Sequence, residues 1–318
     1  MNADGRWFEL RERGSLLGMR IITWVYRRMG RPIARLLLYP IVGYFYLSNH
    51  RARRASLDYL KRLHAAGRLP GAPPGQVQVF RHLLAFGNSI LDRVGFWLGR
   101  REDFELDVHG MELLDAVAGE GRGALVLGAH LGSFDAMRLV ASLRSPIRIH
   151  VLMHTANAPH INTVLGQLEA EADDLKVGVL PMEPGRIEHV LKIRSRVQKG
   201  DVVALLADRS HPNEAERSTP VDFLGAPAPL PQGPMLLAAA LRCPVLFMVG
   251  IRTGSRHYEI HVEKFADPVT LPRQQRPEAV QRYCQSYADR LARYCEKAPH
   301  QWFNFYDFWS LETPHDDR

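Results

Sequence analysis

Short apolar runs alternate with helical segments from residue 104 onward, and this alternation restricts the fold more than any other feature of the sequence. Strands separated by helices are typical of a largely parallel sheet. The chain must return from the end of one strand to the start of the next parallel strand, and a helix usually makes this connection. The expected strands are 104–109, 123–129, 147–153, 176–180, 201–206, 245–251 and 258–262. The expected helices are 112–118, 134–143, 158–172, 186–198, 234–241 and 277–297. We therefore expect an α/β fold, with a mostly parallel central sheet flanked by helices.

The chain has 318 residues, which is enough to bury a large core, and its composition divides it into three parts. Residues 1–48 form an N-terminal segment, and residues 49–100 are expected to be helical, with helices at 51–66 and 77–98. A loop rich in proline and glycine separates these two helices. Residues 101–318 form the α/β domain.

The N-terminal segment holds two apolar stretches, 16–26 and 36–47, with arginines between them. Each is shorter than the roughly 20 apolar residues that span a bilayer, and no signal-peptide cleavage pattern follows. Apolar and basic faces lie side by side, with tryptophan and tyrosine residues nearby. This pattern predicts a pair of amphipathic helices in a membrane interface. The alternative is that both helices pack on the domain core and leave their arginines in solvent.

The net charge of +7 favours an anionic partner, such as a membrane surface or an acidic ligand. Nucleic acid is not expected, because the sequence has no zinc finger, no RNP-like pattern and no long basic tail. The three cysteines have neither zinc nor redox spacing, and their odd number argues against a disulfide framework. A reducing location facing the cytosol follows.

His130 and Asp135 are the most informative pair of polar residues. An apolar stretch, 123–129, ends at His130, and a helical pattern begins shortly after it. Residues five apart on one helix lie about 140° apart, so contact between the two requires a turn. Gly132 permits that turn, and Ser133 is a plausible N-cap that places Asp135 in the first helical turn. The pair fits a general base and the carboxylate that orients it, or a buried histidine bonded to a cap residue.

Asp208 and Arg209 follow the strand expected at 201–206. In open α/β sheets, ligands gather beyond the carboxyl ends of the strands, so both residues should lie in the same crevice as His130. Arg209 could bind a phosphate or carboxylate, or the two residues could form a structural pair that closes a loop.

A turn-rich loop, which contains Phe223 and Gly225, leads into the apolar helix expected at 234–241. It could shape an apolar slot. No metal site is expected from His150, His154 and His160, because an i,i+4 pair shares a face only in a helix and no glutamate follows. The sequence has no phosphate-binding glycine loop and no GxSxG nucleophile elbow.

Taken in order along the chain, these residues resemble the lysophospholipid acyltransferase superfamily, and within it the lipid A biosynthesis (lauroyl/myristoyl) branch. The first motif of that family, His-x4-Asp or His-x4-Glu, is matched by His130 and Asp135. Its third region has an aspartate after a strand and then Phe-x-Gly before proline-rich sequence. Asp208, Phe223 and Gly225 are similar to that region.

The C-terminal segment is also similar to that of the family, with Pro299 followed by Gln301 and Trp302. The resemblance has departures, which indicate a divergent subgroup. Asp135 stands where the lipid A branch usually has glutamate, and His154 lies where the second region usually offers an arginine. Arginines also interrupt the N-terminal segment, which is a spanning helix in typical members.

The resemblance implies a membrane-associated O-acyltransferase. His130 would be the general base and Asp135 its orienting carboxylate, and backbone N–H groups near Gly132 and Ser133 would stabilise the oxyanion, with His154 or Arg209 as alternatives. The residues expected to contact substrate are Gly132, Ser133, His154, Asn157, Asp208, Arg209, Phe223 and Gly225.

The same resemblance implies the partners. The acyl donor would be a thioester of acyl carrier protein or coenzyme A, and the acceptor a lipid or glycolipid hydroxyl. No cofactor and no metal are expected. The protein would lie on the cytoplasmic face of the bacterial inner membrane, as a peripheral or monotopic protein. Two alternatives remain, namely a non-catalytic lipid-binding protein of this fold and a thioester or ester hydrolase that uses the same dyad.

Overall fold

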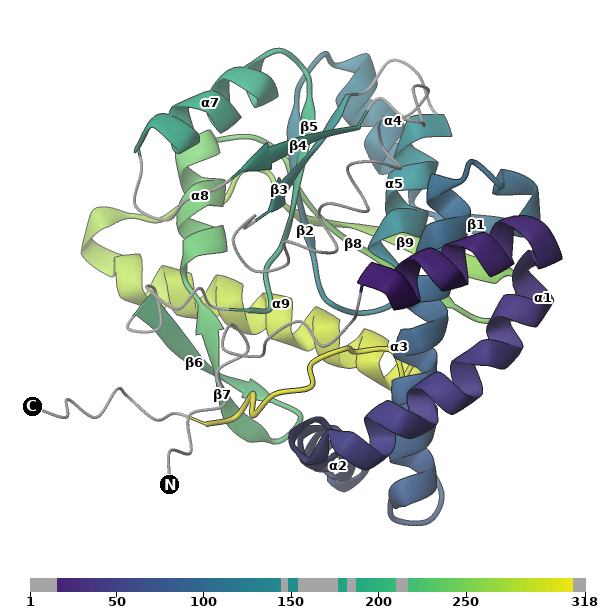
Figure 1. Ribbon diagram of the computed structural model, residues 1–318. Coiled ribbons are helices and arrows are strands. Elements are labelled where there is room, and N and C mark those ends of the chain that lie inside the picture. Colours follow the sequence, from purple (N-terminus) through teal and green to yellow (C-terminus); the bar gives the residue numbers. More distant parts are fainter. Residues whose placement is uncertain (1–15, 144–147, 154–176, 182–186, 210–216, 311–318) are drawn as a thin grey trace, which may run out of the picture.

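A computed structural model describes residues 16–143, 148–153, 177–181, 187–209 and 217–310 (Figure 1). The helices of the described chain are α1 (Leu16–Ser48), α2 (His50–Ala65), α3 (Gln76–Trp97), α4 (Met111–Gly119), α5 (Phe134–Leu143), α7 (Ile187–Gln198), α8 (Gly233–Leu241) and α9 (Arg276–Lys297). Two short 3-10 helices are η2 (Arg101–Asp103) and η5 (Arg273–Gln275). The strands are β1 (Glu105–His109), β2 (Ala124–Gly128), β3 (Ile149–Met153), β4 (Val177–Pro181), β5 (Val202–Leu206), β6 (Ser218–Phe223), β7 (Ala226–Pro231), β8 (Val245–Arg252) and β9 (His257–Ala266).

The described strands pair into one seven-stranded sheet, in the order β1-β9-β8-β2-β5-β3-β4, and a separate β6–β7 hairpin. All neighbours in the large sheet are parallel except β8 and β9, which are antiparallel. The expected mostly parallel sheet is therefore confirmed. The carboxyl ends of β2 and β5, which are direct neighbours, meet at one edge of the sheet.

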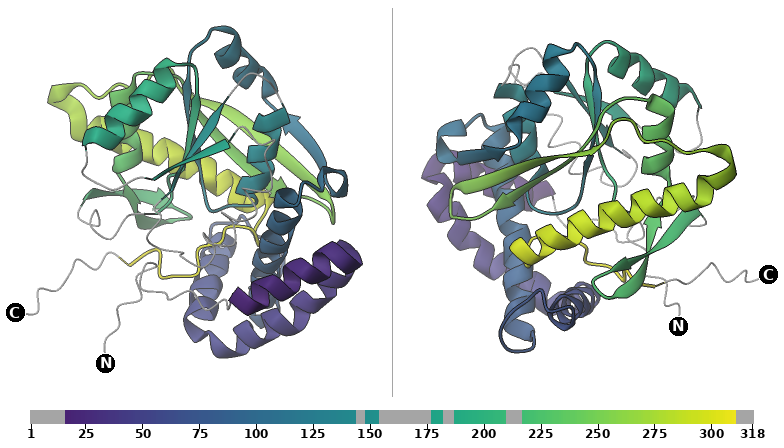
Figure 2. Two further views of the ribbon diagram at one scale, coloured as in Figure 1. Left: turned by 45° about the horizontal axis from the view of Figure 1, so that its top comes forward. Right: turned by 180° about the vertical axis from the view of Figure 1, so that it is seen from behind.

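Alternate residues of the central strands enter two different cores, because successive side chains of a strand point to opposite faces. Ala124 and Val126 of β2 pack with residues of α4 and α5. Leu125 and Leu127 pack on the other face, with residues of α7, α8 and α9. Figure 2 shows α9 lying across this second face in the view from behind. Helices thus cover both faces, and the central strands β2, β5 and β8 are buried on both sides.

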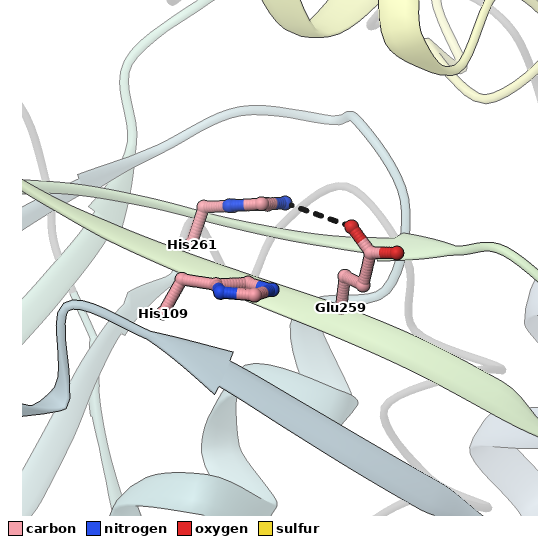
Figure 3. Close-up of side chains that lie close together, drawn as sticks. All are labelled: His109, Glu259 and His261. Carbon is pink, nitrogen blue, oxygen red and sulfur yellow. Dashed lines mark ion pairs between the residues drawn. The ribbon is translucent and has the colours of Figure 1, made fainter.

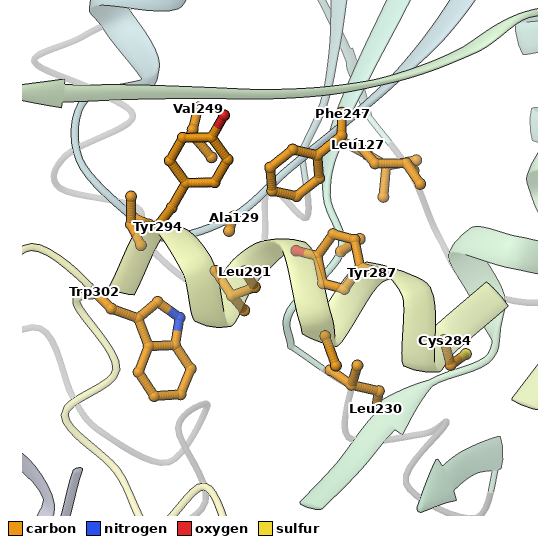
Figure 4. Close-up of a cluster of buried hydrophobic side chains, with 14 of the residues drawn as sticks. Leu127, Ala129, Leu230, Phe247, Val249, Cys284, Tyr287, Leu291, Tyr294 and Trp302 are labelled. Atoms are coloured by element: carbon orange, nitrogen blue, oxygen red, sulfur yellow. The ribbon is translucent and has the colours of Figure 1, made fainter. Parts of the chain in front are cut away.

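Aromatic side chains fill much of the space between the sheet and α9 (Figure 4). Phe247 of β8 packs against Tyr287 and Tyr294 of α9, with ring centroids 5.6 and 5.8 Å apart. Trp302, from the segment after α9, is completely buried in the same cluster. The cluster fixes the segment that follows α9 beneath the carboxyl edge of the sheet.

The N-terminal helices wrap around α3. α1 bends at Gly30, whose φ of 80° and ψ of 172° are not helical, so the two expected helices form one kinked element. Arg31 is buried, and its guanidinium makes two hydrogen bonds to Asp92 of α3, at 2.7 and 3.0 Å. Arg27 and Arg28 are exposed. One face of α1 therefore packs on the domain, as the alternative interpretation expected.

The opposite face of α1 is apolar as well, and no described part of the chain covers it. The large apolar side chains that α1 exposes are Ile21, Trp24, Met29, Ile33, Leu36, Leu37, Tyr39, Ile41, Tyr44 and Leu47. Most of the large apolar side chains that the described residues expose belong to this set. No described helix has both the length and the apolar content to cross a bilayer.

The hairpin β6–β7 is the main departure from the expected elements. We expected a loop over these residues, but they form an antiparallel ribbon that packs against α9. Its prolines are tolerated because a two-stranded ribbon has open edges, where a missing N–H donor breaks no ladder hydrogen bond. The helix expected at 158–172 lies outside the described residues.

Candidate active site

His130 lies just beyond the carboxyl end of β2, held between the sheet and the segment after α9. The backbone N–H of Phe303 donates to the carbonyl oxygen of His130 at 2.7 Å, and Leu131 forms a bridge with Trp302. The His130 side chain is 28% exposed, so its ring is fixed on one side and accessible on the other.

Asp208 binds the fixed side of the His130 ring. Its Oδ1 lies 2.7 Å from Nδ1 of His130, and its Oδ2 accepts the backbone N–H of His130 at 3.0 Å. Oδ2 also accepts the indole N–H of Trp302 at 3.0 Å. Asp208 follows β5, the strand adjacent to β2, and it is completely buried. Asp208 therefore lies against His130, as expected from the ends of neighbouring strands, but it is buried beneath the histidine ring.

The charge state of this pair follows from its surroundings. Burial by itself would raise the pKa of Asp208, but His130, Arg209 and the hydrogen bonds from His130 lower it to about 2. An ionised carboxylate only accepts hydrogen bonds, so Nδ1 of His130 must carry the proton. Burial, and then the charges of Arg209 and Arg93, lower the pKa of His130, although Asp208 acts in the opposite direction. The ring is therefore neutral at pH 7, with the Nε2 lone pair ready to accept a proton.

Asp135 does not occupy the expected position at the Nδ1 of His130, which Asp208 takes instead. Asp135 lies in the first turn of α5, as predicted, and its Oδ2 accepts a hydrogen bond from Nε of Arg93 at 2.6 Å. It is buried, whereas Arg93 of α3 is 29% exposed. The correction has a topological cause. Adjacent parallel strands bring Asp208 to the histidine, while the turn after His130 directs Asp135 toward α3.

Gly132 and Ser133 form the predicted turn and cap. Gly132 has a φ of 71°, and a Cβ at this position would collide with the carbonyl oxygen of Gly250. Oγ of Ser133 accepts the N–H of Ala136 at 3.1 Å, as an N-cap does. Their backbone N–H groups donate to the carbonyl oxygens of Gln301 and Gly250, at 2.8 and 2.7 Å. The expected oxyanion donors are therefore already used by the fold.

Arg209 ties the segment after α9 to the sheet. Its Nε donates to Oδ1 of Asn304 and its Nη2 donates to the carbonyl oxygen of Phe303, both at 2.7 Å. The guanidinium carbon lies 5.6 Å from the centre of the Tyr306 ring. These contacts give Arg209 a structural role through Asn304 and Phe303, and its positive charge lies near His130.

Phe223 and Gly225 belong to the β6–β7 hairpin. Phe223 is buried, and its ring stacks on Trp309 and meets the edge of Trp302. Gly225 forms the tight turn between β6 and β7, with a φ of 78°. The expected contact of Phe223 with substrate is therefore replaced by packing in the core. His154 and Asn157 lie outside the described residues.

Three residues that we did not assign to the site support it, namely Arg93, His82 and Trp302. Nε2 of the buried His82 lies 2.9 Å from the carbonyl oxygen of Trp302, and Nδ1 lies 2.9 Å from Oγ of Ser56. Burial lowers the pKa of His82 to about 3, so this ring is neutral and structural. Only Trp302 had a signal in the sequence, through the C-terminal motif.

The fold and this pair define an α/β protein with a neutral, proton-accepting histidine at the carboxyl edge of a mostly parallel sheet. The chain belongs to the bacterial lipid A biosynthesis acyltransferase family, whose sequence model matches residues 86–310. The matched region includes His130, Asp135, Asp208 and Trp302, and it begins after α1 and α2. A comparison with curated proteins finds no match. The resemblance stated from the motifs is thereby confirmed.

Proposed function

We propose that the protein is a membrane-associated O-acyltransferase. It moves a fatty acyl chain from an acyl thioester to a hydroxyl group of a lipid or glycolipid. Family membership supports acyl transfer to a lipid A-like acceptor. The observation that carries the proposal is the neutral His130 ring, which Asp208 holds through Nδ1 and which is 28% exposed.

In the proposed reaction, Nε2 of His130 takes the proton of the acceptor hydroxyl as the oxygen attacks the thioester carbonyl. A C–O bond forms, the C–S bond breaks, and the imidazolium returns its proton to the departing thiolate. Asp208 stabilises the imidazolium and keeps the ring in the tautomer that exposes the Nε2 lone pair. No free acid is released, because the acyl group passes directly to the acceptor.

Asp135 then acts through Arg93. A guanidinium held through Nε can still present its other N–H groups to an anion. Arg93 is partly exposed and close enough to His130 to lower its pKa, so its charge can serve the oxyanion or an anionic substrate group. In this proposal Asp135 is a positioning residue that acts through Arg93 and not through contact with His130.

The uncovered apolar face of α1 supports the membrane part of the proposal. Trp24, Tyr39 and Tyr44 are the residue types that favour the bilayer interface, and Arg27 and Arg28 suit anionic lipids. The face would lie in one leaflet, because the opposite face of α1 packs on α3.

The donor in this proposal is a thioester of acyl carrier protein or coenzyme A. Such donors are cytosolic, so we place the protein on the cytoplasmic face of the bacterial inner membrane. The net charge of +7 suits both an acidic carrier and an anionic membrane.

The test supplies the purified full-length protein with acyl-CoA or acyl carrier protein thioesters and a lipid A precursor in mixed micelles. Thiol release and the mass of the lipid product are measured together. We expect His130→Ala to lower turnover by at least about 10²–10⁴-fold, as for a lost general base. His257→Ala is the matched control, since this histidine lies on β9 and pairs with Glu105 and Asp107.

Three results would contradict the proposal. Near wild-type turnover of His130→Ala would exclude the mechanism. Release of free fatty acid without an acceptor would indicate a hydrolase. Tight lipid binding without thiol release from any thioester would indicate a non-catalytic lipid-binding protein.

A further inference from the structure

Two histidines face each other across the β1–β9 pair at the edge of the sheet. His109 of β1 and His261 of β9 are register partners, and Glu259 lies two residues before His261 on the same face of β9. Figure 3 shows both rings extending in one direction, with the Glu259 carboxylate near their far ends. None of the three residues takes part in the His130–Asp208 pair.

The side chains converge closely. One ligand atom from each of the three residues lies within 4.8 Å of the other two. The imidazole rings are nearly parallel, with an interplanar angle of 14° and centroids 4.8 Å apart. Nε2 of His261 lies 3.3 Å from Oε2 of Glu259.

Nε2 of His261 also lacks a well-aligned hydrogen bond. It is buried, and it makes no hydrogen bond with any described residue. A buried ring nitrogen is normally well hydrogen bonded, so one with only this loose contact to Glu259 calls for a further ligand. A cation at the far ends of the two rings, beside the carboxylate, would use its lone pair.

One positive charge lies near the three residues. The ring of Tyr294 is tilted against the ring of His261, with centroids 5.1 Å apart. Lys297 lies over the Tyr294 ring, 5.3 Å from its centre, and its charge opposes a bound cation.

We propose that His109, Glu259 and His261 form a binding site for one divalent ion of the zinc class. Two imidazoles and one carboxylate suit Zn²⁺, Co²⁺ or Ni²⁺, whereas Mg²⁺ and Ca²⁺ prefer oxygen ligands throughout. Bonds of about 2.0–2.2 Å require the three groups to move slightly closer on binding, which side-chain rotation allows. The ion would link the edge strand β1 to β9.

The experiment uses the full-length protein without a histidine tag, in detergent and freed of metal by a chelator. Zn²⁺ affinity is measured by competition with a coloured chelator, and Co²⁺ serves as a spectroscopic probe. Burial raises the pKa of Cys243 to about 11 and that of Cys284 to about 12, so these thiols stay protonated and do not compete.

We expect one Zn²⁺ per chain, no binding of Mg²⁺ at the same concentration, and a higher thermal midpoint with Zn²⁺. His109→Ala and His261→Ala should each weaken Zn²⁺ binding at least tenfold, and Lys297→Met should strengthen it. His257→Ala is the control on the same face of β9 and should leave the affinity unchanged.

The proposal fails if the wild-type protein binds no Zn²⁺, or if the double variant His109→Ala, His261→Ala binds it as tightly. It also fails if His257→Ala removes binding as completely as His261→Ala. Because His109 is exposed, its loss should not disturb folding, and the thermal midpoint without Zn²⁺ checks this. Neither readout depends on acyl transfer.

Discussion

Nδ1 of His130 and Oδ1 of Asp208 lie 2.7 Å apart, although 78 residues separate them in the sequence. The contact exists because β2 and β5 are neighbours and both end at the same edge of the sheet. It makes Asp208, rather than Asp135, the carboxylate that sets the tautomer of the histidine.

We expect Asp208→Asn to lower kcat by roughly 10³–10⁴-fold, as the loss of the orienting carboxylate does in hydrolytic triads. An amide can donate to Nδ1, which would move the ring proton to Nε2 and block the base. The measurement is steady-state thiol release. The double variant with His130→Ala should be no slower than His130→Ala alone, and additive losses would contradict a shared role.

Asp135→Asn should act on the same step as Arg93→Gln. Each change removes the ion pair between the two side chains, which are 2.6 Å apart, so each should raise KM for an anionic substrate. A double-mutant cycle on kcat/KM measures their coupling. We expect the double variant to be about as impaired as the worse single variant. Independent effects would show that Asp135 acts elsewhere.

The pH dependence of kcat/KM should reflect the lowered pKa of His130. The neutral ring is the active form, so activity rises with pH through this pKa and then reaches a plateau. Burial and two arginines lower the pKa, and the midpoint should therefore fall below about 6.5, the ordinary value for histidine. Arg93→Gln removes one positive charge and should move the midpoint upward.

Arg122→Gln provides the control for that shift. Arg122 is an exposed arginine that pairs with Glu120 and Asp267, away from the site. Its loss should leave the midpoint unchanged. A midpoint that stays fixed or falls in Arg93→Gln would contradict the electrostatic role of Arg93.

The buried pair of Arg31 and Asp92 should matter for stability. Arg31→Ala leaves the Asp92 carboxylate buried, with the Tyr258 hydroxyl as its remaining donor among the described residues, at 2.6 Å. The unpaired buried charge should therefore cost about 3–5 kcal/mol. Arg68→Ala, in a partly exposed pair with Glu296, should cost at most about 1 kcal/mol. Urea unfolding in detergent measures both.

A substitution that neutralises Asp92 tests whether its unpaired charge causes the loss of stability in Arg31→Ala. Asp92→Asn keeps an acceptor for Tyr258 but removes the charge. The double variant Arg31→Leu, Asp92→Asn should be more stable than Arg31→Ala. If it is less stable, loss of packing rather than an unpaired charge dominates.

Leu36→Ser and Leu47→Ser together should weaken binding to anionic vesicles at least about tenfold. Each leucine buried in lipid contributes roughly 1.5–3 kcal/mol, and about 1.4 kcal/mol is a factor of ten. Deleting residues 1–48 is a poorer test, because it also removes the partner of Asp92. Leu191→Ser is the matched control, since Leu191 is 58% exposed on α7 and Leu36 is 66% exposed on α1. Equal losses in both variants would exclude a specific membrane face.

Periodicity was sufficient to predict the strands of the large sheet, because burial on both faces gave the central strands apolar runs with clear boundaries. The hairpin β6–β7 was missed because Pro220, Pro227 and Pro229 resemble a loop when the pairing partner is unknown. For the site, strand ends predicted that Asp208 lies near His130. The partner of each carboxylate could not be predicted, since that depends on how α3 and the segment after α9 pack.

The contacts of Trp302 determine when the site can form during synthesis of the chain. Its indole donates to the buried carboxylate of Asp208, and the neighbouring residues pair with the backbone at His130. A growing chain that has released β2 and β5 from the ribosome therefore still lacks this hydrogen bond to Asp208. The His130–Asp208 pair should reach its final arrangement only after residues 301–304 emerge.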